Sequence, residues 1–186
     1  LGIAIVSGHT ATFDSLLNLV GVCTAYGTVK PEKLITPGKA RAEDCILCTK
    51  TVGLETLINF SLAHKTLAQQ LFGSEQSGKL AAQVKMQSCV KEALKLAEIS
   101  GVHAMHDATE GGIIAALNEI AEASKLGFII EAEKLPIRVE MQKLKKHFKL
   151  SDEQVLGSSS AGTILVAVDP HAKDEVTEVL QKMGVP

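Results

Sequence analysis

The stretch MHDATEGG, residues 105–112, joins a short apolar segment to an amphipathic one, and the pattern predicts a strand, a turn and a helix in that order. Glycines at the helix start let a ligand or another backbone segment approach closely. The first N–H groups of a helix have no partner inside it, so they favour a phosphate or a carboxylate. Asp107 and Glu110 lie three residues apart and could both reach such a ligand. The same spacing is close to a capping box, which needs no ligand, and the sequence leaves both interpretations open.

If the turn is catalytic, its side chains divide into two kinds of candidate. The catalytic candidates are His106, Asp107 and Glu110; His106 would orient the loop or assist proton transfer, and Asp107 is also the candidate metal ligand. The binding candidates are Thr109 and the backbone at Gly111 and Gly112.

Two further turns carry small polar residues next to predicted strands. The stretch SGHTATFD, residues 7–14, follows an apolar run, and glycine with polar groups at a strand end is a usual ligand-contact position. His9 and Thr10 are the candidates there, although a lone histidine is more often structural. The stretch GSSSAGT, residues 157–163, could form a nest of N–H groups that includes Ser159 and Gly162, or could be a plain turn. It lacks the lysine of a P-loop, and a strand follows it.

Between these turns, the periodicity predicts alternating strands and helices, hence an α/β or α+β fold with a domain boundary at about residues 30–42. The predicted strands are 3–7, 16–29, 45–49, 102–105, 128–130 and 162–168. Apolar spacing predicts helices over about 54–71, 79–99, 113–126, 141–149, 152–156 and 176–183, with a loop at 73–78.

The composition narrows the class of protein. Apolar residues make up 46% of the 186 residues and charged residues 22%, which is the balance of a soluble globular protein. A net charge of −2, no Trp and one Tyr argue against nucleic-acid binding, and no apolar run is long enough to cross a membrane. Few cysteines suggest a reducing, cytoplasmic setting. Cys45 and Cys48 have a metal-like spacing but no second ligand pair, so core thiols are the favoured interpretation over a redox or metal pair.

The order of these motifs resembles the PurM superfamily, which includes AIR synthase and HypE. The stretch AEDCILCTKTVGLET, residues 42–56, is similar to the junction of that family's two domains, and MHDATEGG is similar to HypE and to archaeal-type AIR synthase-related proteins. The stretch SSSAGTILVAVDP, residues 158–170, fits the same C-terminal domain. The matching positions of the first stretch are Asp44, Thr49, Lys50, Gly53, Leu54, Glu55 and Thr56.

The resemblance implies a PurM C-terminal-domain-like mixed sheet with packed helices over residues 39–186. Residues 1–38 would be the last strands of an ATP-binding, homodimer-forming domain whose main part precedes this sequence. It also implies ATP and Mg²⁺ as cofactors, with His9 and Thr10 near the nucleotide phosphates. The implied reaction is activation of an amide or carbamoyl oxygen by phosphorylation, as in a ligase or dehydratase. The partner would be a small-molecule substrate or a carbamoyl-transfer protein, with no nucleic acid and no membrane.

Two departures keep an alternative open. His9 occupies a position where the family often has a carboxylate, and the sequence ends without the reactive cysteine of HypE. Both favour a non-catalytic PurM-like module for dimerisation or small-ligand binding.

Overall fold

The computed structural model describes residue 4 and residues 21–186, and it divides the chain into two units, Leu1–Leu34 and Ile35–Pro186. The strand predicted at 3–7 and the turn with His9 and Thr10 lie outside the residues that can be described, apart from residue 4. Residues 21–30 have no regular secondary structure, so the strand predicted over 16–29 is not formed in its described part. Whether the domains divide at residue 38 remains a prediction.

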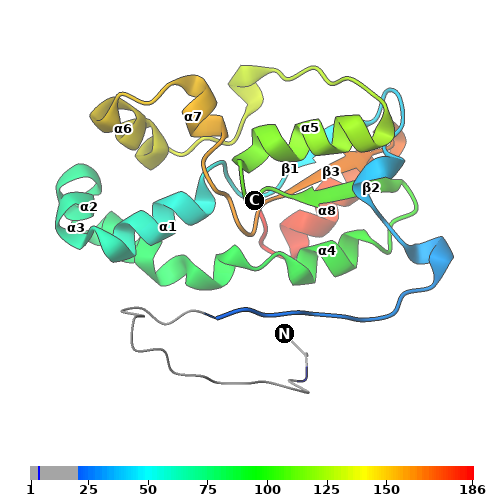
Figure 1. Ribbon diagram of the computed structural model, residues 1–186, viewed down its shortest axis with the longest axis horizontal. Coiled ribbons are helices and arrows are strands. Elements are labelled where there is room, and N and C mark those ends of the chain that lie inside the picture. The colour runs from blue at the N-terminus through cyan, green and yellow to red at the C-terminus, as the bar shows by residue number, and fades with distance from the viewer. Residues whose placement is uncertain (1–3, 5–20) are drawn as a thin grey trace. The chain divides into compact units, whose positions relative to one another are not determined.

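The centre of the second unit is a three-stranded sheet in the order β1-β3-β2 (Figure 1). Its strands are β1 (Cys45–Cys48), β2 (Val102–Asp107) and β3 (Ile164–Val168), and both neighbouring pairs are antiparallel. Cys45 is paired with Val168 on one side of β3, and Asp107 is paired with Ile164 on the other. All five residues of β3 are buried, as expected for a continuous apolar strand at the centre of a sheet.

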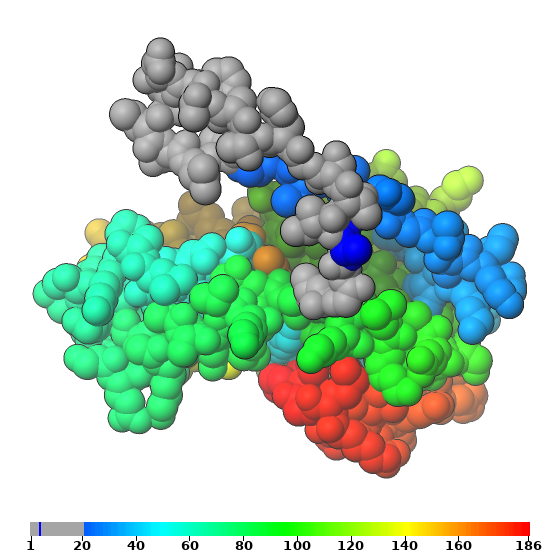
Figure 2. Space-filling view, turned by 90° about the horizontal axis from the view of Figure 1, so that it is seen from below, coloured from blue at the N-terminus to red at the C-terminus, as the bar shows by residue number. Residues whose placement is uncertain are grey.

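Helices cover both faces of this sheet. α5 lies on one face, and α4 and α8 lie on the other (Figure 1). Seen from the α4 side, α4 and α8 are neighbours, and α1 to α3 form a group beside them (Figure 2). The bounds are α1 Leu54–Ala63, α2 Lys65–Phe72, α3 Ser74–Ala81, α4 Val90–Leu96, α5 Gly112–Ser124, α6 Val139–Phe148, α7 Asp152–Leu156 and α8 Lys173–Lys182. Short 3-10 helices occupy Pro31–Lys33, Pro37–Lys39, Ala82–Gln87, Ala132–Lys134 and Pro170–Ala172.

The sheet separates two apolar cores because side chains alternate between its faces. Leu165 of β3 packs with Ile113, Leu117 and Ile120 of α5 in the first core. Ile164, Val166 and Val168 pack with α4 and α8 in the second, where Leu96, Val176 and Leu180 are buried. This arrangement confirms the predicted class, a small sheet with packed helices.

Several local predictions are corrected by the structure. The helix predicted over 54–71 is divided at His64 into α1 and α2. The helix predicted over 79–99 is broken: α3 ends at Ala81, and α4 begins at Val90 after a 3-10 segment. The predicted loop at 73–78 is mostly the first part of α3. Residues 128–130 form no strand, and their side chains are exposed.

The cysteines of β1 face opposite sides of the sheet, as their spacing predicts. Cys45 packs against the second core and Cys48 against the first, and both are free thiols. Burial raises the pKa of the Cys48 thiol to about 12. Among the residues that the structure describes, no helix is both long and apolar enough to span a membrane.

Candidate functional site

Three turns meet beyond one end of the sheet: residues 49–53 before α1, residues 107–112 before α5, and residues 156–163 before β3. The Ser160 N–H donates to the Ala108 carbonyl at 2.9 Å, and the Ala108 N–H donates to the Thr163 carbonyl at 2.9 Å. The Gly53 N–H donates to Ser160 Oγ at 2.7 Å. The two predicted turns, 105–112 and 157–163, are therefore in direct contact, and the segment after β1 joins them.

Glycine is required where these turns touch. Gly112 has a φ of +61°, and a Cβ built there would lie 2.4 Å from the Leu156 carbonyl oxygen and 2.7 Å from that of Ser158. Gly162 has a φ of +96°, and its Cβ would lie 2.1 Å from the Met86 carbonyl oxygen. Gly162 is thus buried against another segment and does not face a ligand-sized opening, whereas Gly111 is exposed.

The start of α5 is not a capping box. Its N-cap is Gly111 in the left-handed region, and no side chain caps the helix. Asp107 instead accepts a hydrogen bond from the Thr109 hydroxyl through Oδ2, at 3.2 Å. Glu110 is exposed and has no partner among the residues described. Neither Asp107 nor Glu110 therefore caps the start of α5, and the capping-box interpretation is wrong.

His106 is held at both ring nitrogens. Nδ1 lies 2.7 Å from the Asp107 carbonyl oxygen, and Nε2 lies 2.6 Å from Glu119 Oε2, two turns into α5. A ring bound on both sides is suited to orienting the loop and has no nitrogen left for proton transfer to a ligand. Sequence reasoning missed Glu119, because nothing in the local pattern links it to a residue thirteen positions earlier.

Ser159 contacts the start of α1 and not the Asp107 side of the junction. Its hydroxyl donates to Glu55 Oε2, and its carbonyl accepts from the Thr56 N–H and hydroxyl, both at 3.1 Å. Glu55 and Thr56 belong to the stretch that resembles the family's domain junction, which is the signal that could have marked them.

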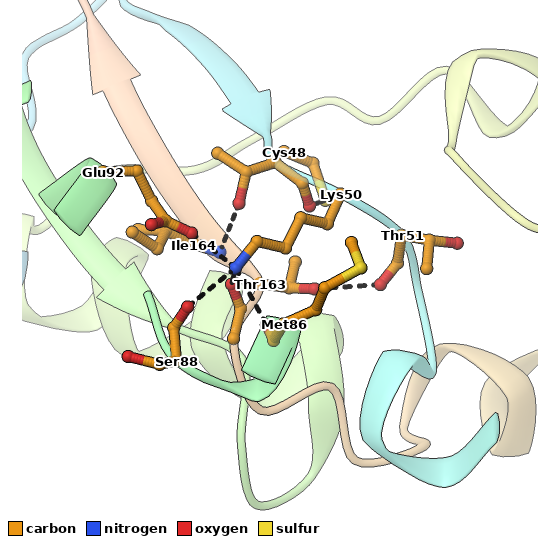
Figure 3. Close-up of polar contacts among 10 residues, drawn as sticks. Cys48, Lys50, Thr51, Met86, Ser88, Glu92, Thr163 and Ile164 are labelled. Carbon is orange, nitrogen blue, oxygen red and sulfur yellow. Dashed lines mark hydrogen bonds and ion pairs between the residues drawn. The ribbon is translucent and has the colours of Figure 1, made fainter. Parts of the chain in front are cut away.

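A buried ion pair underlies the junction (Figure 3). The Lys50 ammonium donates to the carbonyls of Met86, Ser88 and Gly162 at 2.9, 3.0 and 2.7 Å, and it pairs with Glu92. Both side chains of the pair are 5% exposed. Carbonyls and carboxylate together compensate the cost of burying this charge. Neither residue was predicted as functional. Lys50 belongs to the stretch that resembles the family's domain junction, whereas no pattern in the sequence marked Glu92.

A hollow of about 320 Å³ lies beside Asp107, lined also by Pro37, Cys89, Ala93, Met105, His106 and Ile164. Burial, and then the carboxylates of Asp107 and Glu92, raise the pKa of the Cys89 thiol, which keeps it protonated at neutral pH. With the Cys89 thiol uncharged, most of the residues that line the hollow are apolar, and Asp107 is the one carboxylate among them.

Asp107 could bind Mg²⁺ only together with ligands that the described side chains do not supply, such as phosphate oxygens and water. Among the described residues, no group of three or more His, Cys, Asp or Glu side chains could enclose a metal ion. Mg²⁺ in phosphate-transfer sites commonly uses one or two carboxylates together with substrate phosphates and water. The exposed carboxylate of Asp107, 48% accessible, is compatible with that mode of binding.

Comparison with known families places this junction in context. Residues 41–186 match the family described as "AIR synthase related protein, C-terminal domain". The chain belongs to this AIR synthase-related family. Within it, the chain is similar to the phosphoribosylformylglycinamidine cyclo-ligases of Thermococcus kodakarensis, at 30% identity over 98% of this chain and 53% of the relative, and of Pyrococcus horikoshii, at 31% over 70% and 39%. The chain thus spans about half or less of these two curated relatives.

Solved structures agree on the AIR synthase-related fold. Escherichia coli HypE, a hydrogenase maturation protein, superposes with a TM-score of 0.63 at 25% identity, covering 80% of this chain and 42% of HypE. Thermotoga maritima PurL complexed with ATP superposes with a TM-score of 0.57 at 18% identity, over 85% of this chain and 23% of PurL.

Proposed function

We propose that this chain is the C-terminal part of an ATP-dependent enzyme that activates an amide or carbamoyl oxygen by phosphorylation. Family membership supports this, together with curated relatives that are cyclo-ligases and structural neighbours solved with ATP. The observation that carries the proposal is the turn at 107–112. The carboxylates of Asp107 and Glu110 lie near the start of α5, and neither of them caps the helix. We place the domain boundary at residue 38, with ATP bound mainly upstream and homodimerisation through the upstream domain.

Each residue of the turn has a proposed task. Asp107 would hold Mg²⁺ jointly with phosphate oxygens, and the metal would neutralise charge on the transferred phosphoryl group. Thr109 and Glu110 would contact the substrate, while N–H groups at Gly111 and the first turn of α5 favour an anion. His106, fixed by Glu119, would hold the loop. His9 and Thr10 would approach the nucleotide.

The test is ATP consumption with Mg²⁺ by the full-length protein and its Glu110→Gln variant. Glu110 has no partner among the described residues, so we expect turnover to fall at least tenfold with the melting temperature nearly unchanged. Glu122→Gln, an exposed glutamate near the other end of α5, is the control and should keep full turnover.

Two results would count against the proposal. Unchanged turnover in Glu110→Gln would remove this residue from the site. No turnover and no nucleotide binding by the unaltered full-length protein would instead support a non-catalytic dimerisation or ligand-binding module.

A further inference from the structure

The segment before β1 is held over the edge of the sheet. We call residues 35–44 the arm. Ile35 packs against the core under α4 and α8, whereas Ala40 packs against the core under α5. Between them, Pro37 lines the hollow beside Asp107, and the arm runs along β2 (Figure 1). Because β2 is an outer strand, the arm passes around this edge from one face of the sheet to the other.

The end of α5 binds the arm through one hydroxyl group. Ser124 Oγ accepts a hydrogen bond from the Ala40 N–H at 3.1 Å and donates one to the Pro37 carbonyl at 2.9 Å. The two backbones are close at this point, since a Cβ built at Gly38 would lie 3.0 Å from the Ala123 carbonyl oxygen. Glycine lets the segments approach this closely. A single side chain of α5 therefore holds the arm on both sides of Gly38.

The other end of the arm is held by a buried pair. Asp44 lies directly before β1, and its two carboxylate oxygens lie 2.9 and 3.1 Å from Nδ1 of His103 in β2. The two side chains are 5% and 8% exposed. The same carboxylate accepts a hydrogen bond from the Arg41 N–H at 2.8 Å. Buried polar groups paired in this way are costly to separate, so α5 and β2 together fix the arm at both of its ends.

The helix α5 connects this anchor to the candidate site. Its first residue, Gly112, ends the turn at 107–112, and its last residue is Ser124. A helix of 13 residues is about 20 Å long and does not stretch. The arm and the turn that carries Asp107 and Glu110 are therefore kept at a fixed separation by contacts within the second unit.

We propose that the arm positions the upstream ATP-binding domain relative to the turn at 107–112, with Ser124 as the positioning residue. The inference rests on the proposed function, which places ATP mainly upstream of this chain. The second unit begins at Ile35, so the joint between the two domains lies immediately before this residue and the arm moves with α5. The proposed boundary at residue 38 then lies inside a fixed segment. Phosphoryl transfer depends on the placement of the reacting groups, and a displacement of about 1 Å can cost about a hundredfold in rate.

Trypsin cleavage of the full-length protein tests whether the arm is fixed. The Lys39 side chain is exposed, but the peptide bond after it carries the Ala40 N–H that binds Ser124. Cleavage requires this backbone to leave its place, so Ser124→Ala should speed cutting after Lys39 by about tenfold or more. Ser100→Ala, at an exposed serine between α4 and β2, is the matched control and should leave the rate unchanged. An unchanged rate in a folded Ser124→Ala variant would overturn the anchoring.

Hydrogen exchange of the unsubstituted protein provides a readout that needs no variant. The Ala40 amide should exchange about a hundredfold more slowly than in an unstructured chain, because its N–H is bonded to Ser124. The Arg41 amide, bonded to the buried Asp44, should be protected as well. An unprotected Ala40 amide would overturn the anchoring by Ser124, and an unprotected Arg41 amide would overturn the fixed position of the far end.

Turnover and nucleotide binding by the same full-length variants test the positioning role. Ser124→Ala should lower kcat by about fivefold or more, while the Kd for ATP should change less than about twofold, because the nucleotide binds mainly upstream. A purely structural role would leave kcat unchanged below the melting temperature, and that result, or a parallel loss of ATP binding, would overturn the positioning role. No turnover by the unaltered protein would instead overturn the proposed function and this role with it, whereas trypsin and hydrogen exchange would still decide whether the arm is fixed.

Discussion

Lys50 shows how one side chain can organise several segments. Its ammonium is the meeting point of β1, the segment before α4 and the turn before β3, through three carbonyls and Glu92. Two of those carbonyls, on Met86 and Ser88, belong to the segment between α3 and α4 and lie 36 and 38 positions from Lys50 in the sequence. The lysine therefore ties this segment to the end of β1.

Replacing Lys50 by methionine should be strongly destabilising. Lys50→Met leaves Glu92 charged and buried, which typically costs about 3–5 kcal/mol of the free energy of unfolding. The matched control is Lys79→Met, since Lys79 pairs with Glu75 on the surface of α3 and should contribute less than about 0.5 kcal/mol. Urea denaturation of both variants measures their free energies of unfolding. Similar losses in the two would contradict a large contribution from the buried Lys50–Glu92 pair.

The thiol of Cys48 should make stability sensitive to alkaline pH. Burial raises its pKa from 9.0 to about 12, so the folded chain holds the proton more tightly than the unfolded chain. This contribution to stability is complete below pH 9 and is lost as the pH rises through the interval up to about 12.

Cys48→Ala removes the titrating group and should flatten the fall in unfolding free energy across that interval. Thiol labelling provides an independent check: the exposed Cys23 should react with iodoacetamide much faster than Cys48 at pH 8. Equal labelling rates would show that Cys48 is accessible.

At the scale of elements, the decisive contact is between the start of α5 and the turn before β3. Gly111 and Gly112 both have positive φ values, and Gly112 has no side chain to collide with the turn at 156–160. The helix can therefore begin in contact with that turn. The candidate site depends on this contact, because the turn at 107–112 takes its position from it.

Gly112→Ala should therefore displace the 156–160 turn. Its new methyl group would overlap the Leu156 and Ser158 carbonyls, and alanine is strained at a φ of +61°. We expect a loss of at least about 2 kcal/mol in unfolding free energy. Gly78→Ala is the control: Gly78 lies inside α3 with open space around it, so that change should stabilise by about 0.5–1 kcal/mol. Thermal unfolding compares the two, and a neutral Gly112→Ala would mean that the turns can separate freely.

At the scale of the whole unit, residues 35–186, one sheet holds two cores. Ile113 lies in the core under α5, and Ile164 of β3 lies in the core under α4 and α8; both are 2% exposed. The side chains are in separate apolar clusters, so trimming each should remove packing that the other does not share.

Ile113→Val and Ile164→Val should each cost about 0.5–1.5 kcal/mol, and the double variant should cost their sum within about 0.5 kcal/mol. Denaturant unfolding of the two single variants and the double variant tests this. A coupling much larger than 0.5 kcal/mol would show that the sheet transmits strain between its faces.

Sequence patterns predicted several elements well and failed where distant contacts intervened. The strands at 45–48, 102–107 and 164–168 and the helix starting near Gly112 follow from apolar periodicity and glycine, which are local properties. The helix expected over 79–99 was wrong: α3 ends at Ala81 and α4 begins at Val90. The segment between them contacts the distant Lys50, and spacing along the chain does not predict such a contact. The strand expected at 128–130 has the right residues, but strand pairing needs a neighbour that no local pattern can supply.

The sequence by itself determined the family, the alternation of helices and strands, and the turn whose glycines and carboxylates form the candidate site. These depend on residue type and spacing, which act over a few positions along the chain. The tertiary structure alone decided that Gly111 and not Asp107 caps α5, that Glu119 holds His106, and that Lys50 and Glu92 are buried together. Those outcomes depend on contacts between residues brought together by folding, and their free energies are set by burial and partner geometry, which spacing along a chain does not encode.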